Sequence, residues 1–225
     1  MDSINSINST LRHDILPAPT HEALELLTTQ QWLQEMGWYL AGGTALALQV
    51  GHRQSVDLDF FCSSSSFSLS SLTSYLQKLQ WKHSILQEGT IYGELCGARV
   101  SFLSYPYFLP KEARINYGYV QILDAKDIAV MKIVAISQRG KKRDFYDLYW
   151  YVQHRENLET LFGRLRYQYP QVAHNYHHVL KSFTYFEDAE NDPEPKIFFK
   201  VKWPDIKTFF KQEIKRITRI LIDLD

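Results

Sequence analysis

The sequence has few cysteines, no long apolar run and no excess of charge of either sign. Its two cysteines, Cys62 and Cys96, cannot form a disulfide framework, and neither belongs to a CxxC pair. No apolar stretch is long enough to span a bilayer, and the first twenty residues lack the apolar run of a secretory signal. The 25 basic and 25 acidic residues balance, so any surface for nucleic acid must be a local patch. We therefore expect a cytoplasmic protein without a membrane partner.

What the chain does contain indicates a packed core. Apolar residues make up 45% of the 225 residues and aromatic residues 14%, which suits one large domain or two small ones. Apolar spacing predicts an α/β core with an N-terminal helix over residues 1–123, followed by a helical region over 124–225. The expected helices are 21–37, 44–50, 69–80, 124–138, 141–154 and 204–222; the expected strands are 55–61, 83–87, 90–96, 98–104 and 119–124, and 187–195 is the expected loop.

Two carboxylates stand out in the stretch SVDLDFF. Successive side chains of a strand point to opposite faces, so Asp57 and Asp59 share one face. They are about 7 Å apart along the strand, by twice the rise per residue. Two like charges so placed favour protonation of one of them unless a cation lies between them, and hard oxygen ligands select Mg²⁺ or Mn²⁺. The alternative is a solvated strand edge that carries two surface aspartates.

A glycine turn precedes this pair. Gly42 and Gly43 permit backbone conformations and close approaches that other residues forbid. Thr44 is expected at a helix start, where free N–H groups favour an anion. Together with Asp57 and Asp59, the turn predicts a site for a nucleoside triphosphate (NTP). Arg53 could add positive charge beside the phosphates, although an exposed ion pair is the simpler interpretation.

Two blocks of the sequence resemble a known family. GGTALALQVGHRQSVDLDFF is similar to the first motif of the nucleotidyltransferase toxins of the AbiEii/AbiGii type, which belong to the DNA polymerase β-like nucleotidyltransferase superfamily. AKDIAVMKIVAISQRGKKRDFYDLY is similar to the second conserved block of that family, and the match runs from about Tyr39 to Trp150. The resemblance implies an α+β fold with a polymerase β-like core, a mixed or antiparallel sheet flanked by helices, and a helical C-terminal region.

The second block adds a cation and two carboxylates. Lys132 interrupts an apolar run, so it either takes the one solvent-facing position of its helix or finds a partner. Asp144 and Asp147 are three residues apart and share one helix face. Asp144 could fix Lys132, act as a general base or favour the helix N-terminus. By resemblance, Lys132 and Asp144 join Asp57 and Asp59 as catalytic residues, and Lys132 and Asp147 join the nucleotide-binding turn.

The resemblance implies an enzyme, a metal-dependent nucleotidyltransferase. It would move a nucleoside monophosphate from NTP to an acceptor hydroxyl, possibly of RNA or tRNA, with Mg²⁺ (or Mn²⁺) held by Asp57 and Asp59. It would be the toxin of a toxin–antitoxin or abortive-infection system, with a cognate antitoxin as partner. One alternative is a catalytically inactive module that binds nucleotide or protein and keeps the fold. A phosphotransferase that acts on a protein is a third possibility.

The sequence departs from the superfamily in one place. A later strand of the superfamily often carries a third carboxylate that acts as general base, and the matching stretch here is GARVSFLSYPY. It offers Arg99, Ser101 and Ser104 but no acid; Glu94 is the nearest acid in sequence. One metal ion held by Asp57 and Asp59, with Asp144 as the base, is therefore the preferred hypothesis.

The last predicted helix has a basic stripe that an acceptor could contact. Lys207, Lys211, Lys215 and Arg219 follow strict four-residue spacing, which can track a phosphate backbone. An ordinary solvated helix face is the simpler interpretation. The histidines near the stretch YQYPQVAHNYHH lack accompanying cysteines or acids, so we expect them on the surface.

Overall fold

The computed structural model describes residues 11–222, with side chains to residue 220. The first ten residues of the predicted core, which also belong to the stretch compared with a secretory signal, lie outside it. The chain divides into two compact units, Met1–Ile128 and Ala129–Asp225, and each is described by itself. None of the helices in the described part combines the length and apolar character needed to cross a membrane.

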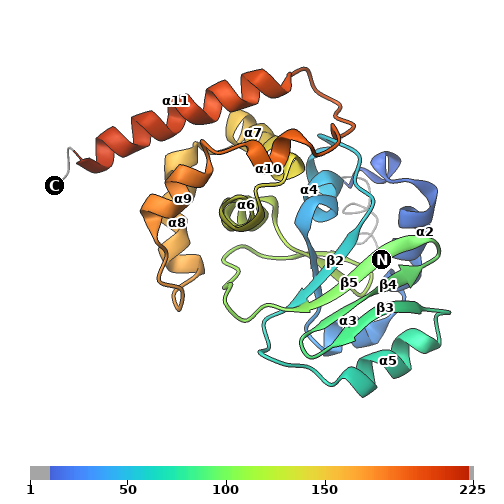
Figure 1. Cartoon of the computed structure of the whole chain (residues 1–225). Helices are drawn as coiled ribbons and strands as arrows, with labels where there is room; N and C mark the ends of the chain where they lie inside the picture. Colours follow the sequence, from blue (N-terminus) through green and yellow to red (C-terminus); the bar gives the residue numbers. More distant parts are fainter. Residues whose placement is uncertain (1–10, 223–225) are drawn as a thin grey trace. The chain divides into compact units, whose positions relative to one another are not determined.

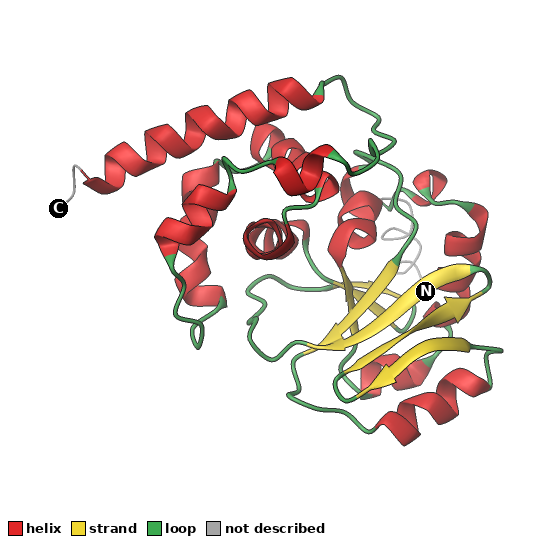
Figure 2. Cartoon of the chain, in the orientation of Figure 1, coloured by secondary structure: helices red, strands yellow, loops and turns green. Residues whose placement is uncertain are grey.

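The first unit is built on a seven-stranded mixed sheet (Figures 1 and 2), in the order β3-β4-β5-β2-β1-β7-β6. Its strands are β1 (Tyr39–Ala41), β2 (Leu58–Cys62), β3 (Lys82–Gln87), β4 (Thr90–Leu95), β5 (Ala98–Ser104), β6 (Ile115–Tyr117) and β7 (Val120–Ile122). The pairs β2–β5 and β1–β7 are parallel and the other four are antiparallel. This confirms the predicted α+β class. The strands expected at 83–87, 90–96 and 98–104 form an antiparallel meander, β3 to β5. Strands β1 and β6 were not predicted, because three residues are too few to show a period.

Helices of the first unit cover the sheet. They are η1 (His13–Ile15), α2 (Ala18–Thr28), α3 (Gln31–Glu35), α4 (Gly42–Val50) and α5 (Leu69–Gln77). The single helix expected over 21–37 is wrong, because Thr29 and Gln30 separate α2 from α3. The buried face of the sheet carries Leu58, Phe60 and Phe102, and the Phe60 and Phe102 rings stack at 5.2 Å.

The second unit is helical in its described part, apart from a single β-bridge residue, Ile197. Its helices are α6 (Ala125–Arg139, whose first turn belongs to the first unit), α7 (Lys142–His154), α8 (Leu158–Gln168), α9 (Tyr176–Ser182), α10 (Glu187–Glu190) and α11 (Trp203–Ile222). The Asp124 carboxylate accepts a hydrogen bond from the Lys126 N–H, as expected of a cap. The stretch 187–195 is not wholly a loop, because it begins with α10. Phe145, Phe183 and Phe210 form the buried aromatic core.

Candidate active site

Asp59 lies in the middle of the sheet. Its strand, β2, lies between β5 and β1, so the solvated strand edge considered from the sequence is wrong. The cross-strand neighbours of Asp59 are Ala41 on β1 and Ser101 on β5. The Ser101 hydroxyl donates a hydrogen bond of 2.7 Å to Asp59 Oδ1. The carboxylate is therefore held in place by the adjacent parallel strand.

Asp57 lies one residue before β2 begins. Its Oδ1 is 2.9 Å from an Arg99 guanidinium nitrogen, and the exposed fractions of the two side chains are 19% and 75%. Because most of the Arg99 side chain lies in solvent, the ion pair contributes little to stability. Arg99 can therefore swing away when a cation binds Asp57.

Neither glycine of the turn leaves room for a side chain without a shift of its neighbours. Gly42 has φ of +70°, and a Cβ on it would lie 2.9 Å from Asp59 Oδ2. A Cβ on Gly43 would lie 2.2 Å from a terminal nitrogen of Arg53. Any other residue at either position would crowd a charged group of the predicted site. The turn thus keeps the space beside Asp59 and Arg53 clear of side chains.

Helix α4 begins at Gly42, two residues before the expected start. Thr44 is buried, and its hydroxyl contacts the Ser55 hydroxyl at 2.9 Å and the backbone carbonyl of Asp57. The Thr44 side chain therefore ties the first turn of α4 to the segment that leads into β2. The residue at the N-cap of α4 is Ala41, which has no polar side chain to cap the helix. The first N–H groups of α4 are therefore candidates for binding an anion.

Arg53 is buried, with 4% of its surface exposed. The expectation of an exposed ion pair is wrong for this residue. One guanidinium nitrogen donates to the backbone carbonyl of Gln54 at 2.9 Å, and another packs on Gly43. Arg53 thus brings a fixed positive charge to the glycine turn.

The Asp57 and Asp59 carboxylates fit a divalent cation. They offer hard oxygen ligands of the kind that Mg²⁺ takes, and Gly42 leaves room beside Asp59 Oδ2 that a Cβ would fill. Ser101 fixes Asp59 through its other oxygen, Oδ1. A carboxylate held through one oxygen presents the second in a defined direction.

The place of the missing third carboxylate is now defined. Strand β5 runs parallel to β2, with Ser101 opposite Asp59, so the stretch compared with the superfamily does lie beside the aspartate pair. Glu94 belongs to β4, where it pairs with Arg99, and β5 separates it from β2. Glu94 is therefore not adjacent to Asp59.

The second unit holds a compact cluster of charges. Lys132 Nζ donates to Asp144 Oδ1 at 2.7 Å and lies 2.6 Å from Asp147 Oδ2. Arg139 binds both oxygens of Asp144, at 2.8 and 3.0 Å. Lys132 is 4% exposed and both aspartates are fully buried. Of the two possibilities for Lys132, the solvent-facing position is wrong. The structure shows a buried lysine with charged partners.

Asp144 is a weak base in this setting. Burial by itself raises the pKa of its carboxyl, but the charges of Lys132 and Arg139 outweigh burial, and the net direction is downward. A carboxylate with a lowered pKa and both oxygens bound accepts a proton poorly. Of the three roles considered for Asp144, the contacts favour the first, which is to fix Lys132.

Three side chains that bind predicted carboxylates were not predicted as their partners. Arg99 and Ser101 have the same alternate spacing as Asp57 and Asp59, and this was the only sign in the sequence that the two strands are neighbours. Arg139 contacts Asp144 across the turn between α6 and α7, and the sequence gives no sign of this contact. Each of the three binds a predicted carboxylate.

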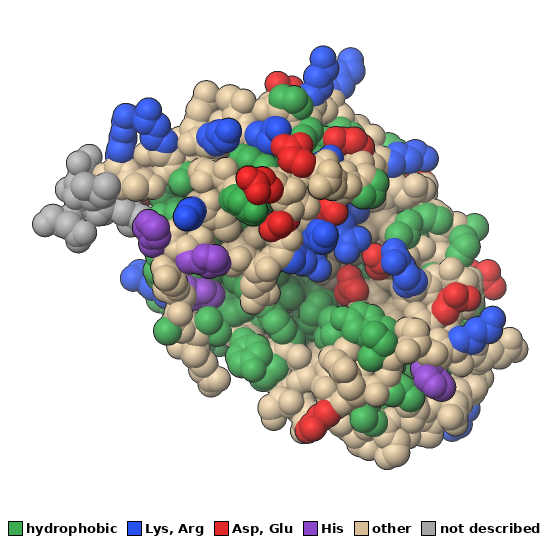
Figure 3. Space-filling model, in the orientation of Figure 1, with side chains coloured by type: hydrophobic (Ala, Val, Ile, Leu, Met, Phe, Trp, Pro, Cys, Tyr) green, Lys and Arg blue, Asp and Glu red, His purple; other side chains and the backbone are tan. Residues whose placement is uncertain are grey.

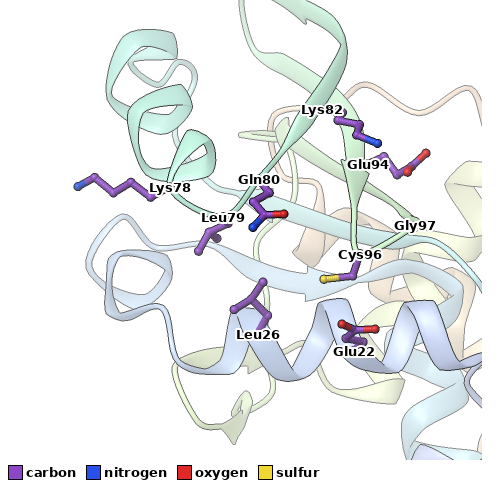
Figure 4. A pocket seen from close by; sticks show the side chains of 9 residues that line it. All are labelled: Glu22, Leu26, Lys78, Leu79, Gln80, Lys82, Glu94, Cys96 and Gly97. Carbon is purple, nitrogen blue, oxygen red and sulfur yellow. The ribbon is translucent and has the colours of Figure 1, made fainter.

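Two pockets lie apart from the predicted residues. The first, of about 480 Å³, opens between the end of α5, α2 and the β4–β5 turn (Figure 4). Its lining residues are Glu22, Leu26, Lys78, Leu79, Gln80, Lys82, Glu94, Cys96 and Gly97. The second, of about 340 Å³, belongs to the second unit and includes Arg139, His178 and Lys181. Neither pocket contains Asp57 or Asp59.

Comparison with known proteins identifies the family. The family model for the nucleotidyl transferase AbiEii toxin of type IV toxin–antitoxin systems matches residues 26–85 and 106–217. The chain belongs to this family. It is accordingly a nucleotidyltransferase, and the matched ranges contain the glycine turn, the aspartate pair and the Lys132 cluster.

Individual relatives agree with this assignment. An uncharacterized protein of Aquifex aeolicus (strain VF5) is 36% identical over 184 residues, which cover 79% of this chain and 86% of the relative. The structure of MenT4, a nucleotidyltransferase toxin from Mycobacterium tuberculosis, has a TM-score of 0.53 at 17% identity and covers 90% of this chain and 86% of its own. The antibiotic-resistance factor ANT(2'')-Ia has a TM-score of 0.51 at 13% identity, and the match covers 71% of this chain and 98% of that factor. The two structural likenesses concern the fold.

Proposed function

We propose that this AbiEii-family nucleotidyltransferase uses a divalent cation to move a nucleoside monophosphate from an NTP to an acceptor hydroxyl. The observation that carries the proposal is the arrangement of Asp57 and Asp59 beside an uncapped glycine turn. Asp59 is fixed by Ser101 through Oδ1, and Gly42 places no side chain beside Oδ2. Mg²⁺, when bound there, neutralises phosphate charge and orients the triphosphate.

The chain's own residues bind the triphosphate and balance its charge. The N–H groups at the start of α4 and the fixed charge of Arg53 receive phosphate oxygens. The acceptor oxygen forms a bond to the α-phosphorus while the bond to the β-phosphate oxygen breaks, so pyrophosphate leaves. The hydroxyl proton passes to solvent or a phosphate oxygen, since Asp144 is a poor acceptor.

Lys132 has the remaining role carried over from the family, as a cation for the triphosphate. Asp144 and Asp147 keep its ammonium in one place, and we assign both aspartates to positioning. The charges of Lys132, Arg139, Asp144 and Asp147 sum to zero. The cluster can thus hold a buried ammonium without a net charge to desolvate.

RNA is the acceptor class that we favour. Lys211, Lys215 and Arg219 are exposed along α11, while Lys207 is paired with Glu190 at 2.5 Å. Figure 3 shows Lys and Arg side chains over α11 on one face of the second unit. A row of exposed cations binds phosphates without reading bases. We further propose that the chain acts as a toxin and is neutralised by a cognate antitoxin.

Label transfer tests this proposal. The protein is incubated with Mg²⁺, total RNA and each of the four NTPs labelled at the α-phosphate. The expected result is labelled RNA that requires Mg²⁺ and is lost in Asp57→Ala. Label that reaches protein from the γ-phosphate would instead indicate a phosphotransferase. Nucleotide binding without transfer to any acceptor would indicate the inactive module.

A further inference from the structure

A second group of possible metal ligands lies in the first unit. His21 and Glu25 are four residues apart on α2 and share one face of the helix, with His21 Nε2 3.4 Å from Glu25 Oε1. His13, from η1, brings its ring to 5.6 Å from the ring of His21. One potential ligand atom from each of the three residues lies within 4.8 Å of the other two.

The surroundings of this cluster support a ligand role. His13 Nδ1 is buried and has no hydrogen-bond partner within the described residues. The Tyr117 hydroxyl donates a short hydrogen bond to Glu25 Oε1, and its ring lies 4.9 Å from the ring of His13. A hydroxyl that orients a carboxylate in this way is the usual support of a metal-binding side chain.

The cluster is separate from the Asp57–Asp59 pair. Tyr117 and Ile115 lie on the same face of β6. Ile115 is paired with Ile122 on β7, Ile122 with Leu40 on β1, and Leu40 with Phe60 on β2, so Tyr117 and Phe60 lie on the same face of the sheet. Side chains of paired residues share a face, and neighbours along a strand alternate. Asp59 is next to Phe60 and so points to the opposite face. Strands β1 and β7 also lie between β2 and β6.

We propose that His13, His21 and Glu25 form a site for Zn²⁺. Two imidazole nitrogens and one carboxylate are a known three-ligand set for this ion, with water as the fourth ligand, whereas Mg²⁺ prefers oxygen alone. A bound ion would join η1 to α2, and through Tyr117 to β6. The site would thus fasten the start of the described chain onto the edge of the sheet.

Calorimetric titration of the metal-free full chain with ZnCl₂, in excess Mg²⁺, tests this site. We expect one Zn²⁺ per chain. His21→Ala and Glu25→Gln should each weaken binding more than Tyr117→Phe, for which about tenfold is expected. His21 and Glu25 are nearly half exposed, so both variants should stay folded, and the melting temperatures of the metal-free proteins check this.

Two controls complete the test. His83→Ala changes an exposed histidine of the same unit and should leave Zn²⁺ affinity unchanged, as should Asp59→Asn. Zn²⁺ should also raise the melting temperature of the wild type but not that of His21→Ala. Absence of saturable binding, displacement of Zn²⁺ by Mg²⁺, or equal affinity in the wild type and both ligand variants would each overturn the proposal. Loss of binding in Asp59→Asn would do the same.

Discussion

Ser101 on β5 donates a hydrogen bond of 2.7 Å to Asp59 Oδ1 on the adjacent parallel strand. In the wider superfamily a carboxylate often occupies a strand beside the aspartate pair, whereas here the neighbour is a hydroxyl. On strands β2 and β5 the described residues thus offer one pair of acids, Asp57 and Asp59, and a side chain that aims Asp59. This arrangement suits a single cation better than two.

Removal of the Ser101 hydroxyl should impair turnover without abolishing it. Ser101→Ala leaves Asp59 in place but no longer fixes the direction of its carboxylate. We therefore expect activity to fall about 10- to 100-fold and the Mg²⁺ concentration needed for half-maximal activity to rise. Ser104→Ala is the matched control, since Ser104 is on the same strand but bonds to the Ser64 carbonyl. Steady-state kinetics over a Mg²⁺ series measures both effects. Equal activities of the two variants would argue against a role for Ser101.

Lys132→Met should strongly destabilise the second unit. The change leaves Asp147 without its Lys132 contact and Asp144 with only Arg139, and loss of one partner of a buried pair costs about 3–5 kcal/mol. Lys141→Met removes a half-exposed lysine that pairs with Asp192 and should cost about 1 kcal/mol or less. Urea unfolding followed by circular dichroism gives both values. A cost for Lys132→Met no larger than that for Lys141→Met would contradict the buried cluster.

The lowered pKa of Asp144 predicts how this cluster responds to acid. The folded pKa lies below the unfolded value of about 3.9. The ionised carboxylate therefore stabilises the fold fully above that value, and this contribution is lost as the pH falls from there through the folded pKa. The destabilisation caused by Asp144→Asn should thus be largest near pH 7 and shrink below about pH 4. Urea midpoints measured over this range test the sign.

Asp188→Asn, at an exposed position, is the control for that series. Its effect on the urea midpoint near pH 7 should be small. If the destabilisation by Asp144→Asn instead grew in acid, the folded pKa of Asp144 would be raised, and its role as a general base would regain support.

The glycine turn makes a steric prediction. A Cβ at residue 43 would lie 2.2 Å from the Arg53 guanidinium, so Gly43→Ala should cost about 1–3 kcal/mol, as overpacking does, and weaken NTP binding. Gly163→Ala adds a Cβ in open space within α8 and should be neutral or stabilising by up to about 1 kcal/mol. Nucleotide titration and urea unfolding check both variants. Wild-type NTP affinity in Gly43→Ala would remove Arg53 from the phosphate site.

Much of the fold could be predicted because it depends on local patterns. Apolar spacing located the three strands β3 to β5 and the start of α6 to within a residue. Strands β1 and β6 have three residues each, and only their pairing with longer neighbours defines them. The break between α2 and α3 likewise depends on packing rather than on apolar spacing.

The site was predicted as a set of residues but not as a set of contacts. The spacing of Asp57 and Asp59 fixed their common face, whereas the contacts with Arg99 and Ser101 depend on the parallel pairing of distant strands. The burial of Arg53 and Lys132 was also missed, because a charged residue in a sequence is expected at the surface. The partners that offset the free-energy cost of burying these charges come from tertiary contacts.

One measurement tests the central claim most directly, namely the Mg²⁺-dependent release of pyrophosphate from NTP with RNA present. The wild type should release pyrophosphate in step with labelled RNA. Asp59→Asn, once circular dichroism has shown that it is folded, should release pyrophosphate at least about 100-fold more slowly, because it lacks a ligand of the cation that orients the triphosphate. Asp188→Asn should match the wild type. Wild-type rates in Asp59→Asn would contradict the assignment of the active site to this pair.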